Sequence, residues 1–141
     1  MFRGWASVAS NCMVFVRGRR RSVAVCRLCG WAVARLADHA CVGIVSLNYP
    51  INQSEERELG WLLWESYEGN GYAVEAASAA RKFAFEELGW AALVSYIATD
   101  NDRSIRLAER MGASKDHDAT KRTEPKTVVY LHHPKKCGSQ K

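Results

Sequence analysis

The sequence predicts one α/β (α+β) domain built on a mixed sheet, and three observations support this class. A chain of 141 residues can bury one hydrophobic core but not two. Apolar runs and helical patterns follow one another in the order β-β-β-α-β-α-β, which is typical of a mixed sheet. Hydrophobic residues make up 48% and charged residues 25%, as in ordinary globular domains.

The positive charge of the chain is concentrated at its N-terminus. The formal net charge is +5, and residues 1–41 hold seven Arg, no Lys and one acid, Asp38. A nucleic-acid footprint is usually a basic face on the folded domain itself, so we expect no nucleic-acid partner. A basic N-terminal arm on an unrelated α/β module that binds nucleic acid stays as an alternative hypothesis.

The cysteines share this asymmetry, since four of the five lie within residues 1–41. An odd count without a recognisable secretory signal favours free thiols in a reducing, cytoplasmic location. The "CRLC" run at Cys26 has the spacing of a zinc half-site or a redox pair, but no second pair or strand–CxxC–helix context accompanies it. We therefore expect no metal, and apolar stretches too short for a membrane helix predict no membrane partner.

Residues 1–29 show no sustained helical or strand period, and we expect them to be poorly ordered or poorly packed. Two explanations stay open: a transit peptide, which is also Arg-rich and acid-poor, or non-native coding from a wrong start or a frameshift. The predicted domain spans residues 30–134, and residues 135–141 form a polar tail.

Within that domain, residues 31–36 ("WAVARL") and 41–47 ("CVGIVSL") predict a hairpin around the turn "ADHA". A loop with Asn, Pro and Ser follows, and "ELGWLLW" at 58–64 predicts a third strand. A helix is predicted from Ala73 to about Leu88, with Arg81 on its polar face and Gly89 as its stop.

The remaining elements are a strand at residues 91–98 and a helix within 100–112, capped by Asn101 or Asp102 and stopped by Gly112. Residues 113–126 ("ASKDHDATKRTEPK") predict a polar loop. The last strand, "TVVYLHH", ends at Pro134.

The junction between the third strand and the first helix is the most informative stretch of the sequence. The turn "EGNGYA" places Gly69 and Gly71 directly before a helix. The first N–H groups of a helix have no intrahelical partner and carry the positive end of the macrodipole, so they suit an anion. Glycine removes the Cβ atoms that would keep a phosphate away. A tight turn without a ligand explains the glycines equally well.

This turn and the residues after it resemble the GNAT superfamily of acetyl-CoA-dependent N-acetyltransferases, nearest to the ribosomal-protein and protein N-terminal acetyltransferase branch. The family's Gln/Arg-x-x-Gly-x-Gly/Ala loop matches residues 68–73 except at Glu68, which puts a carboxylate near a diphosphate. Its Asn-x-x-Ser motif, followed by a helix and a glycine, matches Asn101, Ser104 and Gly112. The resemblance covers residues 30–134 and implies a GNAT-like mixed central sheet with helices on both faces.

The resemblance further implies acetyl-CoA as co-substrate, held in a V between two parallel strands, with a bulge that frees backbone groups of the first. The residues that it assigns to cofactor binding are Leu62, Leu63, Trp64, Gly69, Asn70, Gly71, Tyr72, Ala73, Asn101 and Ser104. Helix capping alone also explains Asn101.

Transfer to an amine needs a neutral nitrogen, so a general base is expected. Deprotonating a lysine amine at pH 7 costs about 4–5 kcal/mol, against about 1 kcal/mol for an α-amine. Glu58 matches the family position of the base. A solvent-exposed role on the surface of an edge strand would explain this carboxylate equally well. Ser104 is the matched candidate for protonating the leaving thiolate. Tyr130 is a second candidate for that role, with packing as its other explanation.

The predicted function is therefore acetyl transfer from acetyl-CoA to a primary amine, either a protein N-terminus or a small amine. Family members open with a strand and two helices that residues 1–29 do not resemble, so these elements are predicted to be missing. A truncated, catalytically silent CoA-binding domain is the alternative. A homodimer is possible, and the sequence does not identify the acceptor.

Overall fold

The computed structural model describes residues 6–7, 12–16, 28–35, 37–48 and 56–134, which form one mixed eight-stranded sheet with three α-helices. The strand order is β1-β2-β3-β4-β5-β6-β8-β7, and all neighbours are antiparallel except β5 and β6, which are parallel. In chain order the elements are β1 (Ala6–Ser7), β2 (Cys12–Val16), β3 (Leu28–Arg35), β4 (Cys41–Asn48), β5 (Glu58–Leu63), the 3-10 helix η1 (Glu65–Tyr67), α1 (Tyr72–Glu86), β6 (Leu93–Ala98), α2 (Asp102–Arg110), β7 (Ser114–Lys115), α3 (His117–Arg122) and β8 (Thr127–His132).

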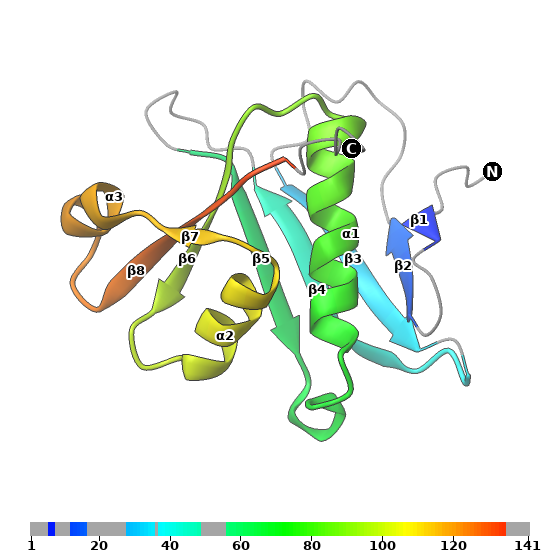
Figure 1. Cartoon of the computed structure of the whole chain (residues 1–141). Coiled ribbons are helices and arrows are strands. Elements are labelled where there is room, and N and C mark those ends of the chain that lie inside the picture. The colour runs from blue at the N-terminus through cyan, green and yellow to red at the C-terminus, as the bar shows by residue number, and fades with distance from the viewer. Residues whose placement is uncertain (1–5, 8–11, 17–27, 36, 49–55, 135–141) are drawn as a thin grey trace, which may run out of the picture.

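Helices lie on both faces of the sheet, as the predicted fold class requires. Figure 1 shows α1 crossing the face of β3, β4 and β5, with α2 beside it. On β6, Leu93 packs in the core beneath α1, whereas the next residue, Val94, packs against Ala119 of α3. Successive strand residues point to opposite faces, so α3 covers the other side of the sheet. No described helix has the length and apolar character needed to cross a membrane.

The main core lies between α1 and the strands beneath it. Small side chains on α1 allow close approach, and Ala77 and Ala84 are completely buried. They meet large strand residues such as Leu47 and Leu59. A continuous apolar layer therefore fixes the position of α1, and with it the position of the turn that leads into α1.

The main elements predicted within residues 30–134 are confirmed: the hairpin, the third strand, both helices, and the strands at 93–98 and 127–132. Asn101 is the N-cap of α2, where its side-chain oxygen accepts from the Ser104 N–H. Gly89 and Gly112 follow the ends of α1 and α2 with φ of 65° and 80°, a conformation that favours glycine.

Arg81 is the main correction within α1. Helical periodicity placed it on the polar face, but it is buried. Its guanidinium donates a hydrogen bond to the backbone carbonyl of Met111, the C-cap residue of α2. Burial lowers its pKa. Contact with α2, which local periodicity does not register, explains the burial, because the guanidinium satisfies a carbonyl that α2 leaves unpaired.

The N-terminal segment also requires a correction. β1 and β2 join the sheet, with β2 antiparallel to β3 from Cys12–Arg35 to Val16–Trp31, so a strand does precede the hairpin. The prediction of a missing first strand is therefore wrong. Backbone pairing with β3 explains this outcome, since a strand can be held by its neighbour without a hydrophobic period of its own. The described residues contain no helix ahead of β3, and the rest of segment 1–29 lies outside them.

A third correction concerns the predicted polar loop at 113–126, which contains β7 and α3. The side chain of Asp116 caps α3 by accepting from the Ala119 N–H at 2.9 Å. Basic residues at the end of α3, Lys121 and Arg122, complement its dipole. The sequence could have indicated the Asp116 cap. It could not indicate the buried contact of Ala119 with Val94 and Val129, which holds this short helix against the sheet.

Candidate functional site

The candidate site is the cleft between β5 and β6. Glu58 and Val94 are the only registered pair between these strands, next to a hydrogen bond from the Val94 N–H to the Arg57 carbonyl at 2.9 Å. Beyond this pair the strands separate, and Figure 1 shows the V that they form. The resulting cleft has a volume of about 200 Å³ and is lined by Glu58, Leu59, Gly60, Trp61, Ser95, Tyr96, Ile97, Ala98, Asn101 and Ser104.

Backbone direction on β5 shows what the cleft offers a ligand. The Arg57 carbonyl points toward β6, so alternate residues, Trp61 and Leu63, turn their backbone groups the same way. Trp64 instead donates its N–H to the Val42 carbonyl on β4. Of the three predicted residues Leu62, Leu63 and Trp64, therefore, Leu63 has its backbone groups directed toward the cleft. The backbone groups of Trp61 have the same direction.

The expected bulge in β5 is not found. The β4–β5 register runs without a shift from Asn48–Glu58 to Gly43–Leu63. The irregularity described in this sheet lies instead between β3 and β4, at Val33 and Ala34. Separation of β5 from β6, rather than a bulge, therefore frees the backbone groups.

The turn before α1 presents open backbone amides. Gly69 and Gly71 have φ of 82° and 81°, in the left-handed region that side chains disfavour. The first helical hydrogen bond runs from the Glu75 N–H to the Gly71 carbonyl, and no side chain caps the helix. The amides of residues 72–74 thus precede the helical bonding pattern and suit an anionic ligand.

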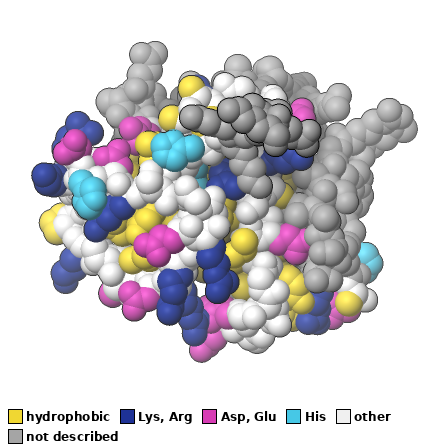
Figure 2. All heavy atoms as spheres, viewed as in Figure 1, with side chains coloured by type: hydrophobic (Ala, Val, Ile, Leu, Met, Phe, Trp, Pro, Cys, Tyr) yellow, Lys and Arg dark blue, Asp and Glu magenta, His cyan; other side chains and the backbone are white. Residues whose placement is uncertain are grey.

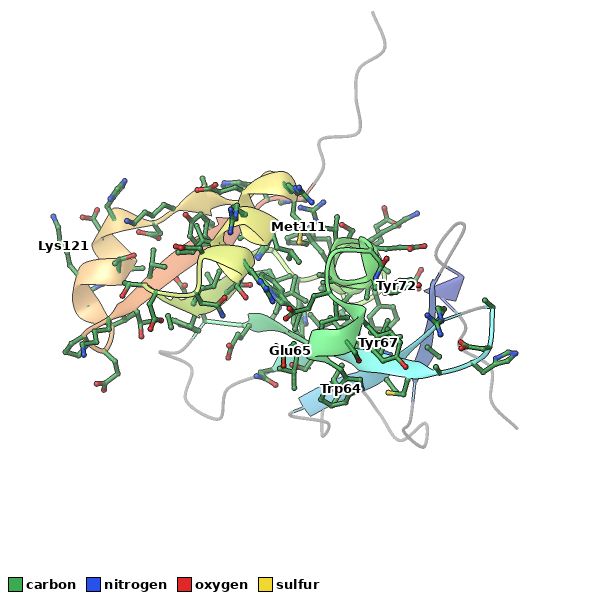
Figure 3. The ribbon with its side chains drawn as sticks, turned by 90° about the horizontal axis from the view of Figure 1, so that it is seen from below. Trp64, Glu65, Tyr67, Tyr72, Met111 and Lys121 are labelled. Atoms are coloured by element: carbon green, nitrogen blue, oxygen red, sulfur yellow. The ribbon has the colours of Figure 1, made fainter. Side chains whose placement is uncertain are left out.

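The Asn70 side chain stabilises the turn without covering those amides. Its Nδ2 donates to the carbonyls of Tyr67 and Glu68, each at 3.3 Å. Figure 3 looks onto this end of α1 and shows Tyr67 and Tyr72 beside it, with Trp64 on the other side of the sheet. The turn is therefore held from within, and its N–H groups stay available.

The carboxylate of Glu68 does not stand alone beside this turn. It forms an ion pair with Arg103, in the first turn of α2. Because the pair is partly exposed, its contribution to stability is small. Its electrostatic effect is local: the guanidinium offsets the negative charge that Glu68 would otherwise present to an anion.

The N-terminus of α2 forms another wall of the cleft and brings Asn101 and Ser104 together. Asn101 is engaged in capping, while Ser104 Oγ accepts a hydrogen bond from Trp61 Nε1 at 3.2 Å. A hydroxyl that accepts through its oxygen keeps its own proton for another partner. Ser104 can therefore donate a hydrogen bond into the cleft.

Glu58 lies at the closed end of the cleft, where it also borders a second cavity. Its Oε2 accepts from Asn48 Nδ2 at 3.2 Å. The second cavity, of about 520 Å³, is lined by Glu56, Glu58, Tyr96, Arg122, Thr123, Glu124 and Thr127. Glu58 and Tyr96 line both cavities, so the carboxylate stands where the two meet.

Tyr130 is placed by the structure as a packing residue. Its ring belongs to a buried cluster with Ile97 and Ala108, and its hydroxyl donates to Glu109 Oε1 at 3.0 Å. Burial and the neighbouring carboxylate raise its pKa. The hydroxyl proton is therefore committed to Glu109.

Trp61, Ser95 and Tyr96 line the cleft but were not among the site residues predicted from the sequence. The alternation of residues along the strand could have indicated Trp61 as a site residue, since it lies two positions before Leu63. The contacts of Ser95 are with residues of two other strands, and local sequence does not predict them. Within the described part of the chain, no group of three or more His, Cys, Asp or Glu residues could hold a metal ion. Figure 2 shows acidic and basic side chains intermingled on the face that carries α1 and α2.

Comparison with known families gives a match to an acetyltransferase (GNAT) domain over residues 5–114, a region that includes β1 and β2. Among curated proteins, the chain is similar to YoaA of Bacillus subtilis (strain 168), an uncharacterized N-acetyltransferase, at 26% identity over 86 residues, 61% of this chain and 49% of that protein. The chain spans less than half the length of the first curated relatives that it matches.

Solved structures show the same likeness. An acetyltransferase from Agrobacterium tumefaciens str. C58 has a TM-score of 0.78 and 26% identity, over 95% of this chain and 96% of that one. A candidate ribosomal-protein-serine acetyltransferase from Vibrio cholerae has a TM-score of 0.66 and 29% identity, over 77% of this chain and 65% of that one.

Proposed function

Because the chain belongs to the GNAT acetyltransferase family, we propose that it transfers an acetyl group from acetyl-CoA to the nitrogen of a primary amine. The observation that carries this proposal is that two open features follow one another along the chain: the cleft beside β5 and the uncapped amides at the start of α1. A thioester arm suits the first feature and a diphosphate suits the second.

The site supports acetyl-CoA by its chemistry. The amides of residues 69–73 would bind the diphosphate, supported by the α1 dipole. Backbone groups of Trp61 and Leu63 would pair with the pantetheine amides, as a further strand would. Bound acetyl-CoA supplies an activated acyl carbon, which the amine nitrogen attacks as the carbon–sulfur bond breaks.

Two side chains are proposed to handle protons during this transfer. Glu58 would accept a proton from the acceptor ammonium before attack, or from the amine nitrogen as it attacks, directly or through water, because it lines both cavities. Ser104 would donate its hydroxyl proton toward the departing sulfur, since its oxygen already accepts from Trp61. Nitrogen thus loses a proton to Glu58 while sulfur gains one from Ser104, and proton exchange with solvent would return both side chains to their starting forms.

The second cavity is the proposed approach for the acceptor. Three of its lining residues are carboxylates (Glu56, Glu58 and Glu124) and one is basic, Arg122. This balance favours an amine that arrives protonated. A protein N-terminus and a small amine are both acceptable on this basis, and the name of the Vibrio cholerae relative adds support to a protein acceptor.

Replacing Glu58 with glutamine is expected to lower kcat at neutral pH by about 10²-fold, because an amide cannot accept the proton. Activity should recover partly at alkaline pH, where more acceptor is already neutral. The measurement is kcat as a function of pH with a single amine acceptor. A glutamine variant whose profile follows that of the wild type would remove Glu58 from the role of base.

The function itself is tested by following release of CoA thiol from acetyl-CoA in the presence of peptides with free N-termini, lysine-containing peptides and small amines. We expect acceptor-dependent thiol release with at least one of these classes. CoA binding in calorimetry without turnover for any acceptor would instead support the alternative, a catalytically silent CoA-binding domain. Absence of CoA binding would exclude both.

A further inference from the structure

A buried polar chain lies at the point where β5 and β6 separate, and none of the steps above uses it. Ser95 on β6 donates its hydroxyl proton to the Leu59 carbonyl on β5 at 2.6 Å. The same oxygen lies 2.9 Å from Nε2 of His132 on β8. All three residues are at most 2% exposed, and Leu59 and Ser95 also border the cleft.

The hydrogen-bond pattern assigns the proton on His132. A carbonyl can only accept, so the single hydroxyl proton of Ser95 goes to Leu59. Ser95 Oγ must then accept from His132, which places the imidazole proton on Nε2. Nδ1 is correspondingly the bare nitrogen, and it is one of two buried side-chain atoms without a hydrogen-bond partner in the described part of the chain.

The position of this chain in the sheet gives it a consequence for the cleft. The Val94 N–H bonds to the Arg57 carbonyl, and in a regular parallel ladder the next bond would join the Tyr96 N–H to the Leu59 carbonyl. The register of β5 with β6 is limited to Glu58 and Val94, and just beyond it the Leu59 carbonyl accepts the Ser95 hydroxyl. This side-chain bond therefore joins the two strands at the point where they begin to separate.

The chain also reaches the other wall of the cleft. The ring of Trp61 packs edge-on against His132, with 6.3 Å between ring centroids. The indole N–H of Trp61 in turn donates to Ser104 Oγ. Trp61 thus contacts both His132, at the closed end of the cleft, and Ser104, the proposed proton donor.

We propose that Ser95, oriented by the Nε2–H of His132, is a positioning residue for acetyl transfer: it holds the Leu59 carbonyl, sets the point at which β5 and β6 separate, and so fixes the depth of the thioester. This inference rests on the proposed function. Without the hydroxyl, the Leu59 carbonyl loses this link to β6, so the two strands can separate further or water can enter. Either change moves the reacting carbonyl away from the attacking nitrogen.

The test compares Ser95→Ala with Ser95→Thr, which keeps the hydroxyl, and with Val129→Ala as a matched control. Val129 is also fully buried in the same sheet, but it packs against α3 on the opposite face. We expect Ser95→Ala to lower kcat by about tenfold or more, with the Kd for CoA changed by less than about threefold, because the diphosphate turn is untouched. Ser95→Thr and Val129→Ala should keep kcat within about threefold of the wild type.

Two results would overturn the inference: wild-type kcat in Ser95→Ala, or an equal loss of kcat in Val129→Ala, which would indicate loss of stability alone. Nitrogen-15 NMR of the histidine rings gives a readout that needs no turnover. We expect the proton of His132 on Nε2 at neutral pH, and a proton on Nδ1 would contradict the chain as described. Failure of the proposed function is separate, since it would appear in the wild type itself, as no turnover with any acceptor or as no binding of CoA.

Discussion

Replacing Gly71 with valine is expected to weaken CoA binding by about 100-fold or more. A β-branched residue is strained at a φ of 81°, so the turn must change its conformation and its amides lose their common orientation. Apart from its own chain neighbours, no atom of the described residues lies within 4 Å of a Cβ at this position, so the added side chain would occupy the space proposed for the diphosphate. Hydrogen bonds to a charged ligand contribute about 1.5–3 kcal/mol each, and about 1.4 kcal/mol corresponds to a tenfold change in Kd.

Gly112→Val provides the matched control for this experiment. Gly112 has nearly the same φ, 80°, and an added Cβ there also meets no neighbour within 4 Å. It follows the C-terminal end of α2, whereas the cleft is at the N-terminal end of that helix. Calorimetry should show a comparable loss of thermal stability in both variants but lost CoA affinity only in Gly71→Val. Retained affinity in Gly71→Val would refute the anion site.

The second large expected effect is a loss of stability in mild acid caused by His132. Burial, together with the positive charges of Arg81 and His133, lowers the pKa of His132 from 6.5 to about 4. In the unfolded chain the imidazole takes up a proton as the pH falls through about 6.5, while in the folded protein it stays neutral down to about 4. The unfolded state therefore binds more protons within this window, and stability falls as the pH falls.

The expected loss of unfolding free energy is about 2 kcal/mol between pH 7.5 and pH 5, and roughly 3 kcal/mol by pH 4. Urea unfolding at these pH values measures it. His132→Gln is the control, because the amide can still donate to Ser95 and does not titrate. The pH dependence of its stability should be flatter than that of the wild type by this amount. Parallel curves for the two proteins would contradict the assignment.

Much of the site could be predicted from the sequence because its signals are local. Glycine at 69 and 71 followed at once by a helical pattern predicts a tight turn with open amides, and the structure has such a turn, with both glycines in the left-handed region. Asn101 three residues before Ser104 predicts a cap, and the cap is present. Each of these features depends on the conformation of a few consecutive residues, which their own side chains determine.

Other features depended on partners far along the chain. Arg81 lies on the polar side by periodicity alone, yet it is buried because Met111, thirty residues away, presents a carbonyl to it. In the sequence, Glu68 places a negative charge next to an expected anion site. In the structure, an ion pair with Arg103 offsets that charge. β2 lacks a clear pattern and is held by its pairing with β3.

The sequence by itself therefore determined the order of the main elements within residues 30–134 other than β7 and α3, together with the glycine turn and the N-cap of α2, since backbone conformation and hydrophobic periodicity are local properties. Only the tertiary structure decided how far β5 and β6 separate and which side chains meet there. Ser95, Leu59 and His132 lie on three strands, and their hydrogen bonds exist only once the sheet has formed. The depth of the cleft is a property of that packing, which no stretch of consecutive residues encodes.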